Sequence, residues 1–74
     1  MRGDITAVAK VVELIGSSKT SLDDAVRNTL KEASKTIRGI RELWISDFKV
    51  LVEDNKIAEY RVNVKLTFLV EGNR

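Results

Sequence analysis

The segment from Tyr60 to Val70 alternates between two sets of residues with almost no interruption. One set is apolar and contains Tyr60, Val62, Val64, Leu66, Phe68 and Val70, and the other contains Glu59, Arg61, Asn63, Lys65 and Thr67. A period of two predicts a β-strand with one buried face, because successive side chains of a strand point to opposite sides. So long a strand in a chain of 74 residues needs a partner for its second face, and we expect any function to lie there.

The composition limits both stability and chemistry. The chain has no cysteine and no histidine, so it has no disulfide, no thiolate metal site and no imidazole base. A single core in a chain of this length rarely supplies more than about 3–5 kcal/mol. We therefore expect one domain over residues 1–74 whose stability depends on close packing of the core or on self-association.

The charge and hydropathy patterns exclude some partners. Thirteen basic and eleven acidic residues leave a net charge of +2, which is too small to indicate a nucleic-acid partner. No apolar run approaches about 18 residues, so we expect no membrane-spanning segment. The first residues carry no apolar core of the signal-peptide kind, and the lack of cysteine is compatible with the cytoplasmic location that we expect.

The first half of the chain predicts a strand and a helix. Residues 5–15 are rich in Val, Ile and Ala, as strands are, and residues 16–19 are typical of a loop. Thr20 or Ser21 can cap the helix that follows. Its apolar stripe at a period of 3.6 contains Leu22, Ala25, Val26, Leu30, Ala33, Ile37 and Ile40.

The second half predicts a β-hairpin. Residues 43–52 form a strand pattern whose parity changes, which indicates a bulge near Asp47. Residues 53–56 predict a tight turn, and residues 57–70 the returning strand. The fold class is therefore α+β, with the order β-α-β-β, a three-stranded antiparallel sheet and one helix across one face. The other face shows Glu42, Trp44 and Ser46 together with the polar row of the last strand, and an exposed tryptophan beside polar groups often marks a contact.

Several segments resemble the dodecin family over nearly the whole chain, from about Val8 to Glu71. They are Gly16-Ser17-Ser18, Ser21-Leu22-Asp23-Asp24-Ala25-Val26, Lys35-Thr36-Ile37-Arg38, Val52-Glu53-Asp54-Asn55-Lys56-Ile57-Ala58-Glu59-Tyr60, and Val62-Asn63-Val64-Lys65-Leu66-Thr67-Phe68. The resemblance implies a hollow homododecamer with the helices outside, which binds a flavin such as riboflavin or FMN and stores it rather than catalysing a reaction.

The resemblance also implies where a flavin would bind. Family members stack the flavin ring on a tryptophan just after the helix and contact its edge with a glutamine on the last strand. These two positions fall on Glu42 and Arg61. Glu42 cannot stack, and Arg61 donates hydrogen bonds but cannot accept one. A branch of the family associated with calcium also lacks the tryptophan and has arginine at the glutamine position.

Three alternatives remain open for these side chains. Trp44 lies two residues past Glu42 and about 7 Å further along the same face, where it can pack at a subunit interface, stack on a ligand or stay exposed. Glu42 and Arg61 can form a salt bridge across adjacent strands, or Arg61 can hold an anion. Glu53 and Asp54 form a solvated turn, or they join carboxylates of other copies around calcium.

We therefore expect a non-catalytic flavin-binding protein with Glu42, Trp44 and Arg61 as candidate ligand residues. The alternative is a dodecin-like assembly without flavin that binds calcium or other ions.

Overall fold

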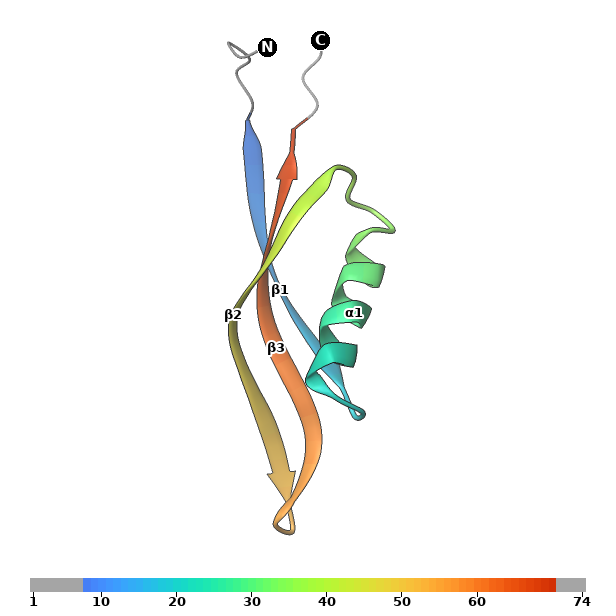
Figure 1. Cartoon of the computed structure of the whole chain (residues 1–74), viewed down its shortest axis with the longest axis vertical. Coiled ribbons are helices and arrows are strands. Elements are labelled where there is room, and N and C mark those ends of the chain that lie inside the picture. Colours follow the sequence, from blue (N-terminus) through green and yellow to red (C-terminus); the bar gives the residue numbers. More distant parts are fainter. Residues whose placement is uncertain (1–7, 71–74) are drawn as a thin grey trace.

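The computed structural model describes residues 8–70, which form a β-α-β-β unit (Figure 1). Its elements are β1 (Ala9–Ser18), α1 (Leu22–Ala33), β2 (Ile40–Glu53) and β3 (Lys56–Leu69). The sheet is antiparallel with the order β1-β3-β2, so β3 is central and the other two strands are edges. The predicted α+β fold is confirmed. The N-terminal part of the first predicted strand, residues 5–7, lies outside the described residues.

The core lies between α1 and the two strands β1 and β3. Val62, Val64 and Leu66 of β3 are fully buried, which confirms the face predicted from the alternation. The other buried apolar residues among those described are only Ala25 and Ala33 of α1. Leu14, Leu22, Val26 and Leu43 pack around this cluster and stay partly exposed. The core is therefore small even for a chain of this length.

The close approach of α1 to β1 depends on a glycine. A Cβ atom on Gly16 would overlap Oγ1 of Thr29, a buried residue whose hydroxyl donates to the carbonyl oxygen of Ala25 at 2.7 Å. The predicted loop at residues 16–19 is wrong for Gly16, Ser17 and Ser18, because β1 continues to Ser18 and only Lys19 lies in the bend that follows. Gly16 is there for helix–sheet packing rather than for a turn.

The helix begins at Ser21, whose hydroxyl accepts from the backbone N–H of Asp24 at 3.0 Å. Buried Ser18 supports this cap, because its hydroxyl donates to Oδ2 of Asp24 at 2.7 Å and accepts from the N–H of Thr20 at 2.9 Å. Of the two predicted caps, Ser21 is the one used.

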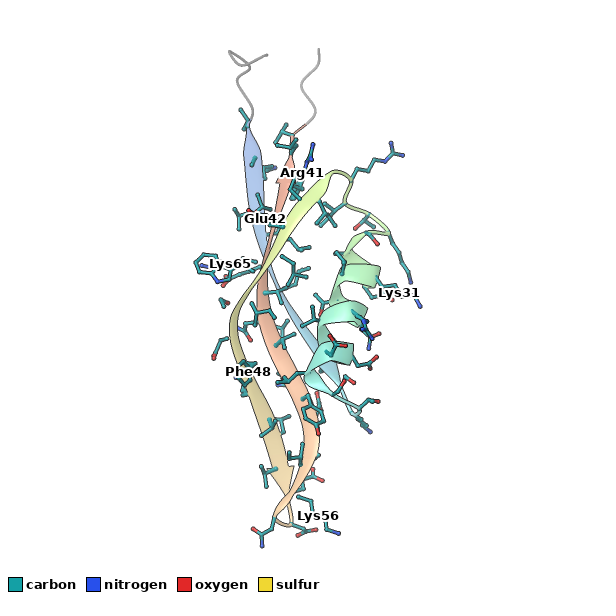
Figure 2. All side chains as sticks on the ribbon, in the orientation of Figure 1. Lys31, Arg41, Glu42, Phe48, Lys56 and Lys65 are labelled. Atoms are coloured by element: carbon teal, nitrogen blue, oxygen red, sulfur yellow. The ribbon has the colours of Figure 1, made fainter. Side chains whose placement is uncertain are left out.

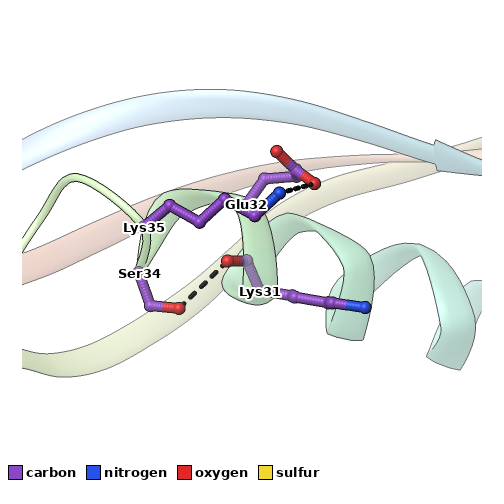
Figure 3. Close-up of polar contacts among 4 residues, drawn as sticks. All are labelled: Lys31, Glu32, Ser34 and Lys35. Carbon is purple, nitrogen blue, oxygen red and sulfur yellow. Dashed lines mark hydrogen bonds and ion pairs between the residues drawn. The ribbon is translucent and has the colours of Figure 1, made fainter.

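The helix ends at Ala33, earlier than the apolar stripe predicts (Figure 3). The N–H of Lys35 bonds to the carbonyl of Glu32 at 3.2 Å, a tighter i−3 spacing. The Ser34 hydroxyl donates to the carbonyl of Lys31 at 3.0 Å, as Figure 3 shows. Gly39 then turns the chain with φ of +73°. Ile37 and Ile40 consequently lie beyond the helix, and Ile40 starts β2.

The two long strands β2 and β3 form the predicted hairpin. Asp54 and Asn55 have φ of +52° and +62°, which defines a two-residue type I′ turn, and Asp and Asn tolerate these angles. The register shifts between Ile45 and Asp47, so the predicted bulge is confirmed and Ser46 is its unpaired residue. Figure 1 shows that the hairpin tip extends past the N-terminal end of α1.

Candidate functional site

The sheet surface opposite α1, which we call the open face, carries the polar row of β3. The register places Arg61, Asn63, Lys65 and Thr67 along its middle, flanked by Glu42, Trp44, Asp47 and Lys49 of β2 and by Val11, Glu13, Ile15 and Ser17 of β1. No helix of the described chain covers this face (Figure 1). The sequence predicted the face and six of these twelve residues, but it did not predict the contribution of β1.

Trp44 and Lys65 form the most distinctive pair on the open face. They are register partners on β2 and β3, and the Lys65 ammonium lies 5.5 Å from the centroid of the indole ring (Figure 2). At this distance a cation is attracted to the face of the ring. Trp44 is nevertheless 66% exposed, so one protomer leaves a large flat aromatic surface in water beside a positive charge. Such a pair can stack a planar molecule and attract an anionic group.

Glu42 lies beside Trp44 but far from Arg61. Its register partner is Thr67, whereas the partner of Arg61 is Lys49. Six residues along β3 separate those two pairs, which corresponds to about 20 Å. The predicted salt bridge between Glu42 and Arg61 is therefore wrong, because the two side chains lie on the same face of the sheet but are not cross-strand neighbours.

Arg61 is held by a different carboxylate. Its guanidinium donates to Oε2 of Glu59 at 3.1 Å, and both side chains are partly exposed. The hydrogen bond from Arg61 lowers the pKa of Glu59 below its ordinary value of 4.5, with further lowering by the Ser17 hydroxyl and the charge of Lys19, while burial acts in the opposite direction. Arg61 therefore meets a ligand as half of an ion pair rather than as a free cation.

Carboxylates do not gather into a metal site within the described part of one protomer. Residues 8–70 contain no group of three or more acidic side chains placed to hold an ion. Glu53 and Asp54 are both exposed at the hairpin turn. Calcium requires six to eight oxygen ligands, so a calcium site would need carboxylates from several copies.

The residues at the two positions where the resemblance implies flavin contacts do not suit a flavin, whereas the chemistry of Trp44 and Lys65 is compatible with one. Glu42 has a negative charge and no aromatic ring. Arg61 forms an ion pair with Glu59 and lies about 13 Å along β3 from Lys65. Trp44 supplies the missing flat surface, and Lys65 supplies a charge suited to a phosphate.

Of the three predicted site residues, Glu42 and Trp44 come together and Arg61 stands apart. Sequence reasoning did not single out Lys65. The signal was present, because counting outward from the two-residue turn at Asp54 and Asn55 pairs Lys65 with Trp44.

Comparisons with known proteins agree with this fold. The family model for dodecin matches residues 8–71. A curated dodecin of Thermus thermophilus is 30% identical over 64 residues, which cover 86% of this chain and 93% of the relative. The solved dodecin of Streptomyces coelicolor has a TM-score of 0.86 at 30% identity and covers 99% of this chain and 100% of its own. The chain belongs to the dodecin family.

A second solved structure is similar in fold. The calcium dodecin of Mycobacterium tuberculosis, whose crystal structure is described as having a novel calcium-binding site, has a TM-score of 0.76 over 90% of this chain and 96% of its own. Its identity of 24% makes this a likeness of fold alone.

Within residues 8–70, no helix is long and apolar enough to cross a bilayer.

Proposed function

We propose that this chain is a non-catalytic binding protein that holds a planar, anionic molecule of the flavin type, such as FMN, on its open face. Trp44 stacks on the ring system and Lys65 attracts the anionic group. The observation that carries the proposal is the Lys65 ammonium 5.5 Å from an indole ring that is 66% exposed.

The pair suits such a ligand for two physical reasons. Lys65 approaches the indole ring, yet most of the tryptophan stays accessible to a second planar group. Stacking of a nucleobase on an aromatic side chain contributes about 1–3 kcal/mol, and a flavin ring offers at least as large a surface. A phosphate near the ammonium adds a charge-assisted contact that uncharged riboflavin lacks.

The other two candidate residues set the limits of the site. Glu42 lies one row from Trp44, about 7 Å away, and its charge opposes a nearby phosphate. Arg61 lies beyond the immediate reach of the Trp44 pair and contacts a ligand only at its far end or from another copy. The proposal of no catalysis rests on the sequence, which contains neither histidine nor cysteine.

Fluorescence titration with riboflavin and FMN tests this function. We expect quenching of flavin fluorescence by the wild-type protein, tighter binding of FMN than of riboflavin, and loss of both in Trp44→Ala. Lys65→Ala should weaken FMN binding selectively. Lys56→Ala is the matched control, because Lys56 also belongs to β3 but lies at the hairpin tip (Figure 2). Absence of quenching at micromolar flavin would defeat the proposal.

We also propose that the protein self-associates, as the resemblance to a dodecameric family implies. The support is the small core together with exposed apolar side chains on both sheet faces, including Ile15 at 68% and Phe48 at 59% exposure. Binding of calcium at the junctions between copies is the alternative function. Calorimetry with calcium separates the two, because heat and a raised melting temperature without flavin binding would favour calcium.

A further inference from the structure

Glu13 of β1 lies directly beside the pair formed by Trp44 and Lys65. Lys65 on the central strand has two register partners, Glu13 on one side and Trp44 on the other. The three side chains therefore form one row across the open face, and Lys65 projects from the sheet away from α1 (Figure 2). Side chains directly opposite each other have Cβ atoms about 4.5–5.5 Å apart, so the Lys65 ammonium can reach either neighbour.

The ammonium lies on the tryptophan side of this row. It is 5.5 Å from the centroid of the indole ring, whereas no ion pair joins it to Glu13 among residues 8–70. Glu13 is exposed and Lys65 is half-buried between its two partners. The Glu13 carboxylate therefore stands uncompensated on the side of Lys65 that faces away from Trp44.

Lys65 is the cation best placed to neutralise Glu13. The four nearest open-face side chains along β1 and diagonally on β3 carry no charge. They are Val11, Ile15, Asn63 and Thr67. The other carboxylates near Lys65, those of Glu42 and Asp47, are diagonal neighbours on β2, the strand that a ligand on Trp44 covers. An ammonium that leaves the indole ring for a carboxylate is therefore expected to move toward Glu13.

A planar ligand and the Lys65 ammonium compete for one face of the indole ring. Because β2 is an edge strand and β3 is central, the ring face that the ammonium approaches lies toward the middle of the sheet. A ligand stacked there also contacts the sheet, whereas a ligand on the opposite ring face extends past the edge and keeps its second side in water. Stacking on the inner face buries more apolar surface, so it is favoured, and it displaces the ammonium.

We propose that Glu13 is a specificity-determining residue, which receives the Lys65 ammonium when a planar ligand displaces it from Trp44. The proposal rests on the proposed function and deepens it. With uncharged riboflavin, an ion pair between Lys65 and Glu13 replaces the lost contact with the ring. With FMN, the phosphate competes with Glu13 for the same ammonium. Glu13 therefore narrows the preference of the site for FMN over riboflavin.

Riboflavin is the sharper probe of this role, because it has no charge of its own. Its binding nevertheless creates an ion pair within the protein, and dissolved salt weakens an exposed ion pair by screening it. The affinity for riboflavin should therefore fall between about 0.01 M and about 0.15 M salt. Stacking alone gives no reason for such a fall.

Fluorescence titration in a double-variant cycle tests the role of Glu13. Glu13→Gln should weaken riboflavin binding about two- to fivefold, the range that corresponds to an opposite-charge cross-strand pair, and should tighten FMN binding about twofold. It should also abolish the salt dependence of riboflavin binding. In a protein that already carries Lys65→Ala, Glu13→Gln should leave riboflavin affinity unchanged. Glu53→Gln, at the exposed hairpin end of β2, is the matched control and should change neither affinity.

The outcomes separate this role from the proposed function. Equal riboflavin affinity of Glu13→Gln and wild type, with quenching intact, would overturn the role of Glu13 and leave flavin binding standing. An equal loss in the Lys65→Ala background would also overturn it, because Glu13 would then act without Lys65. A wild-type protein that quenches neither flavin would overturn both.

Discussion

Gly16 of β1 and Thr29 of α1 approach so closely that a Cβ atom on the glycine would overlap the threonine hydroxyl. This contact sets the distance between helix and sheet on the β1 side. Both residues also line a groove of about 380 Å³ between the helix and the first strand, which we call the α1–β1 groove.

Gly16→Ala should destabilise the protein by about 1–3 kcal/mol, because an added methyl group in a tight contact forces the backbone apart. Thr29→Ala removes the hydroxyl that the methyl group meets, so the double variant should recover part of the loss. Urea unfolding of the four proteins at one fixed concentration measures this coupling. Strictly additive losses would contradict the proposed steric cause.

Ser18→Ala should also destabilise the fold, by about 1–3 kcal/mol, because buried polar groups lose their partner. The Ser18 hydroxyl bonds to Asp24 and to the N–H of Thr20. Ser34→Ala is the control, since Ser34 is exposed and its hydroxyl bonds only the carbonyl of Lys31 among the described residues. That change should stay within about 0.5 kcal/mol in the same urea experiment.

Stability should fall in acid through Glu59. Its pKa in the folded state is lowered by Arg61 from the ordinary 4.5, so its contribution is fully present above that pH and is lost as the pH falls through the lowered value. Glu59→Gln should flatten this part of the stability profile, and Arg61→Gln should flatten it similarly by removing the donor. Carbon-detected NMR titration of the Glu59 carboxyl group measures the shift directly. Profiles of Glu59→Gln and wild type that run parallel through this range would contradict the assignment.

Glu42→Gln should tighten FMN binding about two- to three-fold at low salt, because it removes a like charge about 7 Å from the Trp44 row. Riboflavin, which has no phosphate, should bind as before. Glu53→Gln at the hairpin end of β2 is the matched control and should change neither affinity. Equal tightening of both ligands would show that the phosphate does not lie near Glu42.

A simple count from the turn finds the row that carries Trp44, but only because two irregularities of the sheet cancel. Counting outward from the pair Glu53 and Lys56 brings Trp44 opposite Lys65, and the structure has that pairing. Two register shifts intervene, one leaving Ala58 unpaired on β3 and one leaving Ser46 unpaired on β2, and they cancel. The salt bridge predicted between Glu42 and Arg61 failed because it used the shared face without this count.

The end of the helix was not predictable from the apolar period. Ile37 and Ile40 continue the stripe after Ala33, yet Ile37 lines the α1–β1 groove and Ile40 pairs with Phe68 on the helix side of the sheet. Both therefore face the same side of the molecule as the helical stripe does. The apolar pattern therefore predicted which residues face this side of the molecule. It did not predict whether they lie on the helix, in the connection after it or on a strand.

The loop predicted at residues 16–19 shows the same limit for small residues. Gly16, Ser17 and Ser18 are typical of loops by composition, but they continue β1. Gly16 admits Thr29, and the Ser18 hydroxyl supports the helix cap. Such roles depend on neighbours that are distant in the chain, so local composition cannot reveal them.

Only five apolar residues are buried within residues 8–70, two of them alanines, and this small core has a consequence for the amount of folded protein in a cell. When folding depends on association with other copies of the chain, the folded fraction rises with expression level by mass action. Dilution then acts as a denaturant, and a weakly expressed gene would yield proportionally more unfolded chain for proteases than a strongly expressed one.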